Sequence, residues 1–378
     1  MAKARPKAKK RKTSRRFLPR IVSLVLTLTS TAGVGVGGWA YRDTPIVQSM
    51  VGKMPSWLTA VLPRTSDRSA DTTGSLSPAG ATAATPGQRL RNGVQQVART
   101  GEQPPATSAE TITIASFNIQ VFGTSKFSKP EVMDVLVQVI RRFDLVAIQE
   151  IRCKLDSLLP DFVQRINADG SQYGFVIGQR LGRTVSKEQY AFIYNRRRIE
   201  VDPNSVLTMS DPNDELHREP LLAHFRVRGV ERTRAFSFWL MNIHTDPDEA
   251  AEELDALANA FQSVQRDGWG EDDIILLGDL NADERHLGRL GQLPGIRYVV
   301  AGVPTNTRGT KTYDNIVFDQ RATIEYSGQW GVMNLMREYQ LSADRALKVS
   351  DHLPVWAVFS AYEGRPAAQL ARQPGNPR

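Results

Sequence analysis

The chain has 378 residues, of which 41% are hydrophobic and 23% are charged, as in a globular protein, and its single cysteine excludes an intramolecular disulfide. The net charge of +8 is unevenly placed, because residues 1–20 contain ten Lys or Arg and no acid, whereas residues 110–360 carry 28 basic and 35 acidic residues. Bulk charge therefore excludes a broadly basic nucleic-acid-binding domain, and an acidic substrate would need local cations.

The N-terminal third predicts a tethered protein. Residues 1–20 form a basic cytoplasmic tail, and residues 21–41 are uncharged, mostly apolar and long enough to cross a bilayer. A cleaved signal segment is the alternative, because Gly38 and Ala40 are small residues before a possible cut. A disordered basic tail on a soluble protein is a third reading. Residues 42–110 predict a flexible linker and 361–378 a disordered tail, which leaves one domain over 111–360.

Within 111–360, apolar runs with strand character alternate with helical patterns, which predicts an α/β domain. The predicted strands cover 111–119, 145–150, 190–195, 236–244, 274–278, 313–318 and 354–359. A helix over 128–143 opens with Ser128 and Glu131 in capping-box spacing, and Pro130 suits its first turn. A second helix over 246–265 opens on Asp246, with Glu249 three residues later.

Polar residues stand at the boundaries of these apolar strands. They are Asn118, Glu150, His244, Asp279, Asn281, Asp314, Asp351 and His352. Taken singly, an Asp or Asn at a strand end is more often a turn former, and a lone His is more often structural. Together they supply what phosphodiester hydrolysis needs, namely acid and base groups and oxygen ligands for Mg²⁺, Mn²⁺ or Ca²⁺. No Cys/His cluster has zinc spacing.

The motifs "IASFNIQVFG", "LVAIQEIR", "KEQYAFIYN", "HREP", "NIHTDPDEAAEELDAL", "GDLNAD", "TYDNIVF" and "VSDHLPV" occur in this order. In this respect the chain resembles the endonuclease/exonuclease/phosphatase superfamily, and most closely its deoxyribonuclease I branch. The resemblance covers nearly all of 111–360 and none of 1–109. It implies a four-layered sandwich of two packed β-sheets flanked by helices. One departure is Ser186, which stands where the branch usually has an aromatic residue that contacts DNA.

The resemblance also implies roles for individual residues. Catalytic roles fall on His244, paired with Glu188, on His352, oriented by Asp314 or Asp351, and on Asp279 and Asn281, which hold the activated water or phosphate oxygens. Metal binding falls on Glu150, with support from Asn118 and Asp351. Arg152 is expected to contact DNA and Arg218 a phosphate. Which histidine is the acid and which is the base stays open.

The sequence thus predicts a Mg²⁺-dependent endonuclease, with Mn²⁺ or Ca²⁺ as possible substitutes, that cuts DNA with little sequence preference. Its partners would be DNA and, through the N-terminal segment, a membrane, and no protein partner is implied. The domain would lie outside the cytoplasm, or be secreted if residues 21–41 are cleaved. A lipid or inositol phosphate is the alternative substrate within the superfamily, and a catalytically inactive binding domain is the rival from another class.

Overall fold

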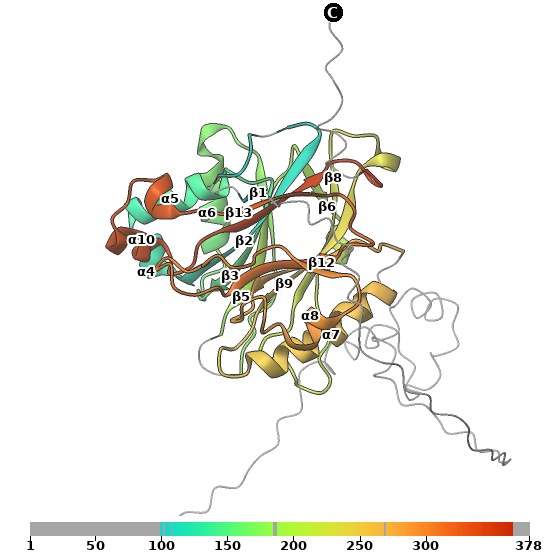
Figure 1. The fold of residues 1–378 in the computed structure, drawn as a ribbon. Coiled ribbons are helices and arrows are strands. Elements are labelled where there is room, and N and C mark those ends of the chain that lie inside the picture. Colours follow the sequence, from blue (N-terminus) through green and yellow to red (C-terminus); the bar gives the residue numbers. More distant parts are fainter. Residues whose placement is uncertain (1–98, 101–102, 107, 184–186, 268–269, 366–378) are drawn as a thin grey trace, which may run out of the picture. The chain divides into compact units, whose positions relative to one another are not determined.

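The computed structural model describes residues 99–100, 103–106, 108–183, 187–267 and 270–365 (Figure 1). The basic segment 1–20, the candidate membrane segment 21–41, nearly all of the predicted linker and Ser186 lie outside these residues. None of the helices in the described part of the chain has the length and apolar character needed to span a bilayer.

Two sheets form the centre of the fold. In spatial order, the first consists of β1 (Arg99–Thr100), β13 (Tyr326–Val332), β14 (Val355–Ser360), β2 (Thr111–Phe122), β3 (Leu145–Ile151), β5 (Gln189–Asn195) and β4 (Tyr173–Ile177). The second consists of β11 (Ile296–Tyr298), β12 (Asp314–Asp319), β10 (Ile274–Asp279), β9 (Ser237–His244), β8 (Leu221–Val227) and β6 (Ile199–Val201), with β7 (Leu207–Thr208) also paired to β8. All seven predicted strands are present.

Helices cover the outer faces of both sheets. They are α4 (Thr124–Phe127), α5 (Pro130–Ile140), α6 (Leu158–Ile166), α7 (Ala250–Asp267), α8 (Gly288–Gln292), α9 (Leu335–Glu338) and α10 (Ala343–Val349), with short 3₁₀ turns at Asn167–Asp169, Pro203–Ser205 and Arg232–Arg234. In Figure 1, α4, α5, α6 and α10 lie on the side of the first sheet, and α7 and α8 lie along the second. The predicted four-layered sandwich is therefore confirmed.

Strand periodicity divides the core into two clusters. Along β10, Ile275 and Leu277 face the first sheet and join the large central cluster, whereas Ile274 and Leu276 face α7 and join a second cluster with Leu257 and its neighbours. Because successive side chains of a strand point to opposite faces, a strand covered on both faces must be apolar throughout. This explains the unbroken "IILL" before Gly278.

Two predicted helix starts need correction. The residue that precedes α5 is Lys129, and Ser128 donates a hydrogen bond to the carbonyl of Ser125 instead of capping α5. The second helix, α7, begins only at Ala250, because Asp246 accepts from the backbone of Asp248 in a turn before it. Outside 111–360, β1 pairs with β13, and the buried Ala361 follows β14.

Candidate active site

Strand register places three of the predicted residues side by side, at the ends of neighbouring strands in the second sheet. The last residue of β10, Asp279, pairs with His244 of the parallel strand β9 and with Asp314 of the antiparallel strand β12. Gly278 allows this close approach, because a Cβ atom there would lie 1.8 Å from the carbonyl oxygen of Ile243. In the "GD" of the motif, the glycine is therefore needed for the close approach of the two strands, and the aspartate supplies a carboxylate to the site.

The buried carboxylate of Asp279 is the centre of the site. Its Oδ2 lies 3.4 Å from Nε2 of His244 and 3.4 Å from Nε2 of His352. The same oxygen accepts a hydrogen bond of 2.9 Å from Asn118, which comes from β2 of the first sheet. The site therefore lies where the two sheets meet, and both predicted histidines face one carboxylate oxygen.

A second carboxylate holds the far side of the His244 ring. Its Nδ1 lies 2.8 Å from Glu188, which is fully buried. The hydroxyl of Tyr190 accepts a hydrogen bond from the backbone N–H of His244 at 3.0 Å and fixes the residue from behind. The tautomer follows from this arrangement, because a carboxylate at Nδ1 favours a proton there and leaves Nε2 facing Asp279.

His352 is held in the same way by Asp314. Its Nδ1 lies 2.9 Å from Oδ2 of Asp314, which also accepts a 2.7 Å hydrogen bond from the Thr305 hydroxyl. Asp351, the other carboxylate that the sequence offered, lies 3.9 Å from Nε2, and its side chain is 43% exposed. Asp314 is therefore the orienting partner, and Asp351 lies at the rim on the Nε2 side.

The electrostatics of the site follow from these contacts. Burial lowers the pKa of His352, but the charges of Asp314 and Asp279 outweigh burial and raise it to about 10. The pKa of His244 is also raised, since Asp279 and Glu188 outweigh burial. Burial would raise the pKa of Asp279, yet the two histidines hold it below its ordinary value. The pKa values of both histidines are therefore raised by the carboxylates that surround them.

Side-chain oxygen atoms that can bind a cation lie next to Asp279. Asn118 donates through Nδ2 to Glu150 at 3.2 Å as well as to Asp279, and its buried Oδ1 has no hydrogen-bond partner among the described residues. Glu150 has a left-handed φ of 62° at the end of β3, and Asn281 has one of 48° after β10. Such strained positions concentrate at functional sites. Oxygen donors of this kind fit Mg²⁺, Mn²⁺ or Ca²⁺.

The predicted arginines lie in the wall of the site. Nε of Arg152 is 3.2 Å from Glu150 and 3.4 Å from Glu188, and the side chain is 27% exposed. Arg218 is more deeply placed, with 4% exposure, and it contacts Glu188 at 3.3 Å and the carbonyl of His244 at 3.1 Å. Arg218 thus supports the carboxylate behind His244, a contact that its motif did not reveal.

Sequence reasoning missed three residues that the fold brings to the site. Two of them are Tyr190, which contacts the backbone of His244, and Thr305, which donates to Asp314. The third is Lys126 of α4, whose buried ammonium group donates to the carbonyls of Ile119 and Val349. Burial lowers its pKa to about 8. Tyr190 stands in the "KEQY" motif and could have been found there, whereas nothing marks Lys126 or Thr305.

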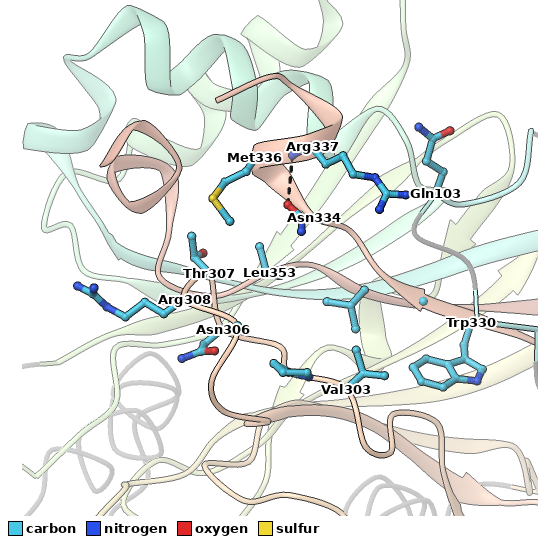
Figure 2. Close-up of a pocket in the computed structure, with 14 residues that line it drawn as sticks. Gln103, Val303, Asn306, Thr307, Arg308, Trp330, Asn334, Met336, Arg337 and Leu353 are labelled. Carbon is cyan, nitrogen blue, oxygen red and sulfur yellow. Dashed lines mark hydrogen bonds between the residues drawn. The ribbon is translucent and has the colours of Figure 1, made fainter. Parts of the chain in front are cut away.

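A cavity of about 810 Å³ lies beside the site and not over it. Figure 2 shows it bordered by the loop that carries Val303, Asn306 and Arg308 and by α9 with Met336 and Arg337. Neither His244 nor His352 lines it, but Asn306 forms a β-bridge with His352. The cavity therefore lies behind the loop that supports one histidine.

Over most of this domain the chain is similar to known proteins. The profile of the Endonuclease/Exonuclease/phosphatase family matches residues 115–352, which include every predicted site residue. Deoxyribonuclease-1-like 2 of Mus musculus is 31% identical over 67% of this chain and 94% of its own length. Deoxyribonuclease gamma of Rattus norvegicus is 30% identical over 65% and 84%. Deoxyribonuclease-1-like 1 of Cricetulus griseus is 34% identical over 66% and 84%.

Proposed function

Because the chain belongs to the endonuclease/exonuclease/phosphatase family, we propose that it is a divalent-metal-dependent endonuclease that hydrolyses DNA with little sequence preference. One observation carries the proposal. Two histidines, each held at Nδ1 by its own buried carboxylate, present Nε2 to the same oxygen of Asp279. A binding domain without activity has no need for two such pairs around one buried carboxylate.

The two histidines account for both proton transfers of the reaction. A water oxygen attacks phosphorus, the bond from phosphorus to the leaving ester oxygen breaks, and the departing oxygen takes up a proton. One Nε2 accepts the proton that the water loses, and the other donates the proton that the leaving oxygen gains. Glu188 and Asp314 orient the two rings and stabilise their protonated forms. The two pairs are built alike, so either histidine can act as the base while the other acts as the acid.

Charge on the phosphoryl oxygens is the remaining requirement. We propose that Glu150, Asn118 and Asp279, with Asp351 at the rim, hold the divalent cation. The unpartnered Oδ1 of Asn118 supports this set, because a buried amide oxygen without a donor has an unmet electrostatic need. When bound, the cation neutralises charge that develops on the phosphate. Mg²⁺ is the ion we expect, with Mn²⁺ or Ca²⁺ as substitutes.

DNA is favoured over a phospholipid as the substrate. The matching relatives are named deoxyribonucleases, and only four large hydrophobic side chains in the described part of the chain are exposed. They are Val121, Leu155, Tyr298 and Ile324. Insertion into a bilayer needs a gathered apolar surface. We propose that Arg152 contacts the DNA and that recognition runs through phosphates, which carry no sequence information.

A nicking assay tests the proposed function. The full chain is incubated with supercoiled plasmid and Mg²⁺ or Mn²⁺, with and without a chelator, and in parallel with sphingomyelin vesicles. We expect nicked plasmid that the chelator abolishes, and no release of phosphocholine. Nicking that survives the chelator would refute metal dependence, and phosphocholine release without nicking would establish the lipid substrate instead.

We further propose that residues 21–41 carry the domain out of the cytoplasm, either as an anchor or as a cleaved signal. The proposal rests on the long uncharged segment that follows the basic residues 1–20. Cell fractionation with an N-terminal epitope tag tests it. A tagged protein in the membrane fraction indicates the anchor, and loss of the tag indicates cleavage. A soluble, tagged protein in the cytoplasm would overturn both.

A further inference from the structure

A second group of carboxylates lies at the opposite end of β10 from Asp279. Asp273 directly precedes β10 of the second sheet, Glu325 directly precedes β13 of the first sheet, and Glu363 follows β14. One carboxylate oxygen from each of these residues lies within 4.8 Å of the other two. We call this group the Asp273 cluster. At about 3.3 Å per residue, the length of β10 separates it from Asp279 by about 20 Å.

The cluster is buried at its base and open at its rim. Asp273 and Glu325 are each 1% exposed, whereas Glu363 is exposed. Glu363 accepts a hydrogen bond from the backbone N–H of Ser237 at 3.2 Å, and Glu325 accepts one from Gly364 at 2.6 Å. These contacts hold Glu363 and Glu325 in place, and the exposed Glu363 leaves the cluster open to solvent.

No cationic side chain in the described part of the chain compensates the negative charge of the cluster. Oδ1 of Asp273 and Oε2 of Glu325 have no hydrogen-bond partner among the described residues, and no Lys or Arg in that part of the chain forms an ion pair with any of the three carboxylates. A buried carboxylate without a partner is strongly unfavourable.

We propose that Asp273, Glu325 and Glu363 bind a structural divalent cation, preferably Ca²⁺, that links the two sheets at the end of the sandwich remote from the catalytic centre. The donors are carboxylate oxygens, which suit a hard cation, and they lack the nitrogen and sulfur ligands that zinc prefers. Ca²⁺ accepts a variable number of oxygen ligands, so water at the exposed rim completes its coordination. The cation offsets the repulsion among the three carboxylates.

The alternative occupant of the cluster is a proton. Two carboxyl groups this close can share one proton, which would also relieve the repulsion. The two readings differ in their response to Ca²⁺ near neutral pH. A cation site is stabilised by Ca²⁺, whereas a shared proton is stabilised by acid and is indifferent to the metal.

Thermal unfolding of the full chain separates these readings. The protein is stripped with a chelator, dialysed at pH 7.5 and titrated with Ca²⁺ alone. Three forms are compared, namely the wild type, the catalytic-site variant Glu150→Gln and the double variant Asp273→Asn/Glu325→Gln. At about 100 times its Kd, Ca²⁺ should raise the Tm of the wild type and of Glu150→Gln by about 5 °C or more. The double variant should show no such rise from this site, and in chelator its Tm should equal or exceed that of the wild type.

Two further measurements keep the test decisive. Equilibrium dialysis with Ca²⁺ should count one ion fewer on the double variant than on the wild type. If the double variant fails to fold, the exposed Glu363→Gln replaces it and should raise the Ca²⁺ midpoint about tenfold. The proposal is overturned if the double variant keeps the full Ca²⁺ response. It is also overturned if Ca²⁺ does not change the Tm of the wild type at pH 7.5 and the Tm rises only in acid, which would identify a shared proton.

Discussion

The two ends of β10 carry aspartates that are equally buried but have different neighbouring side chains. Asp279 at one end and Asp273 at the other are each 1% exposed. Two histidines and Asn118 surround Asp279 and hold its pKa below the ordinary value, whereas Glu325 and Glu363 surround Asp273, whose pKa is raised to about 9. Burial is therefore equal at the two ends, and the neighbours alone decide whether the carboxylate stays ionised without a metal.

This difference gives the two ends different roles, with reaction chemistry at the Asp279 end and structural stabilisation at the Asp273 end. Histidines at the Asp279 end can exchange protons with a substrate, so this end can catalyse a reaction as well as hold a cation. The Asp273 end has only carboxylates and can do no more than bind a cation or a proton. Variants at the two ends should therefore affect different measurements, with activity changing at one end and metal-dependent stability at the other.

The largest expected effect is the loss of either histidine. His244→Ala and His352→Ala should each lower the plasmid nicking rate by about 10²- to 10⁴-fold, because each removes one proton-transfer group. The double variant should lose little more than the worse single variant, since the two histidines act as a unit. Initial nicking rates at saturating Mg²⁺ provide the measurement. Fully multiplicative losses would show that the histidines act independently.

Glu188→Gln should affect both activity and stability. The nicking rate should fall about 10- to 100-fold, because the ring of His244 loses its orienting carboxylate. Removing this buried charge also leaves Arg218 without its carboxylate partner, so we expect the free energy of unfolding to fall by about 3 kcal/mol. Urea denaturation measures the second effect. A lower rate with unchanged stability would mean that Arg218 finds another partner or faces solvent.

Apolar runs with polar ends predicted the strands from the sequence, whereas the four-layered arrangement and the roles of the site residues came from the family resemblance. The "IILLGDLNA" run predicts a buried strand that ends in two polar side chains, and the family resemblance suggests their histidine partners. What the sequence could not give depends on contacts between distant segments. The pairing of Arg99–Thr100 with β13, the burial of Arg218 against Glu188 and the Asp273 cluster all belong to this class.

The ends should also differ in their dependence on pH, measured in chelator. The folded pKa of His352, about 10, exceeds its unfolded value of about 6.5, so its stabilising contribution is complete below pH 6.5 and disappears as the pH rises through 10. His352→Gln should flatten the fall in Tm between pH 7 and 10. The raised pKa of Asp273 likewise makes stability fall between about pH 4 and 9, and Asp273→Asn should flatten that window.

A single pH series of Tm values on the wild type and both variants checks these windows. Identical curves for His352→Gln and the wild type would contradict the described pairing of His352 with Asp314 and Asp279. An unchanged slope in Asp273→Asn would show that its carboxyl group titrates normally.

The smallest expected effect concerns Arg152. Arg152→Ala should lower nicking by less than about tenfold and should reduce the salt dependence of DNA binding by about one unit of slope, as expected for one lost phosphate contact. Binding of a short duplex to a catalytically inactive background, measured from 50 to 200 mM salt, gives the slope. A lower rate with an unchanged slope would indicate that Arg152 only positions Glu150 and Glu188.

The measurement that tests the account most directly compares the two ends of one strand. Asp279→Asn and Asp273→Asn are assayed side by side with the wild type for nicking of supercoiled plasmid in Mg²⁺, after circular dichroism has shown that all three are folded. We predict that Asp279→Asn loses at least about 10²-fold in rate, whereas Asp273→Asn stays within about twofold of the wild type. Equal rates for the two variants would contradict the assignment of catalysis to the Asp279 end.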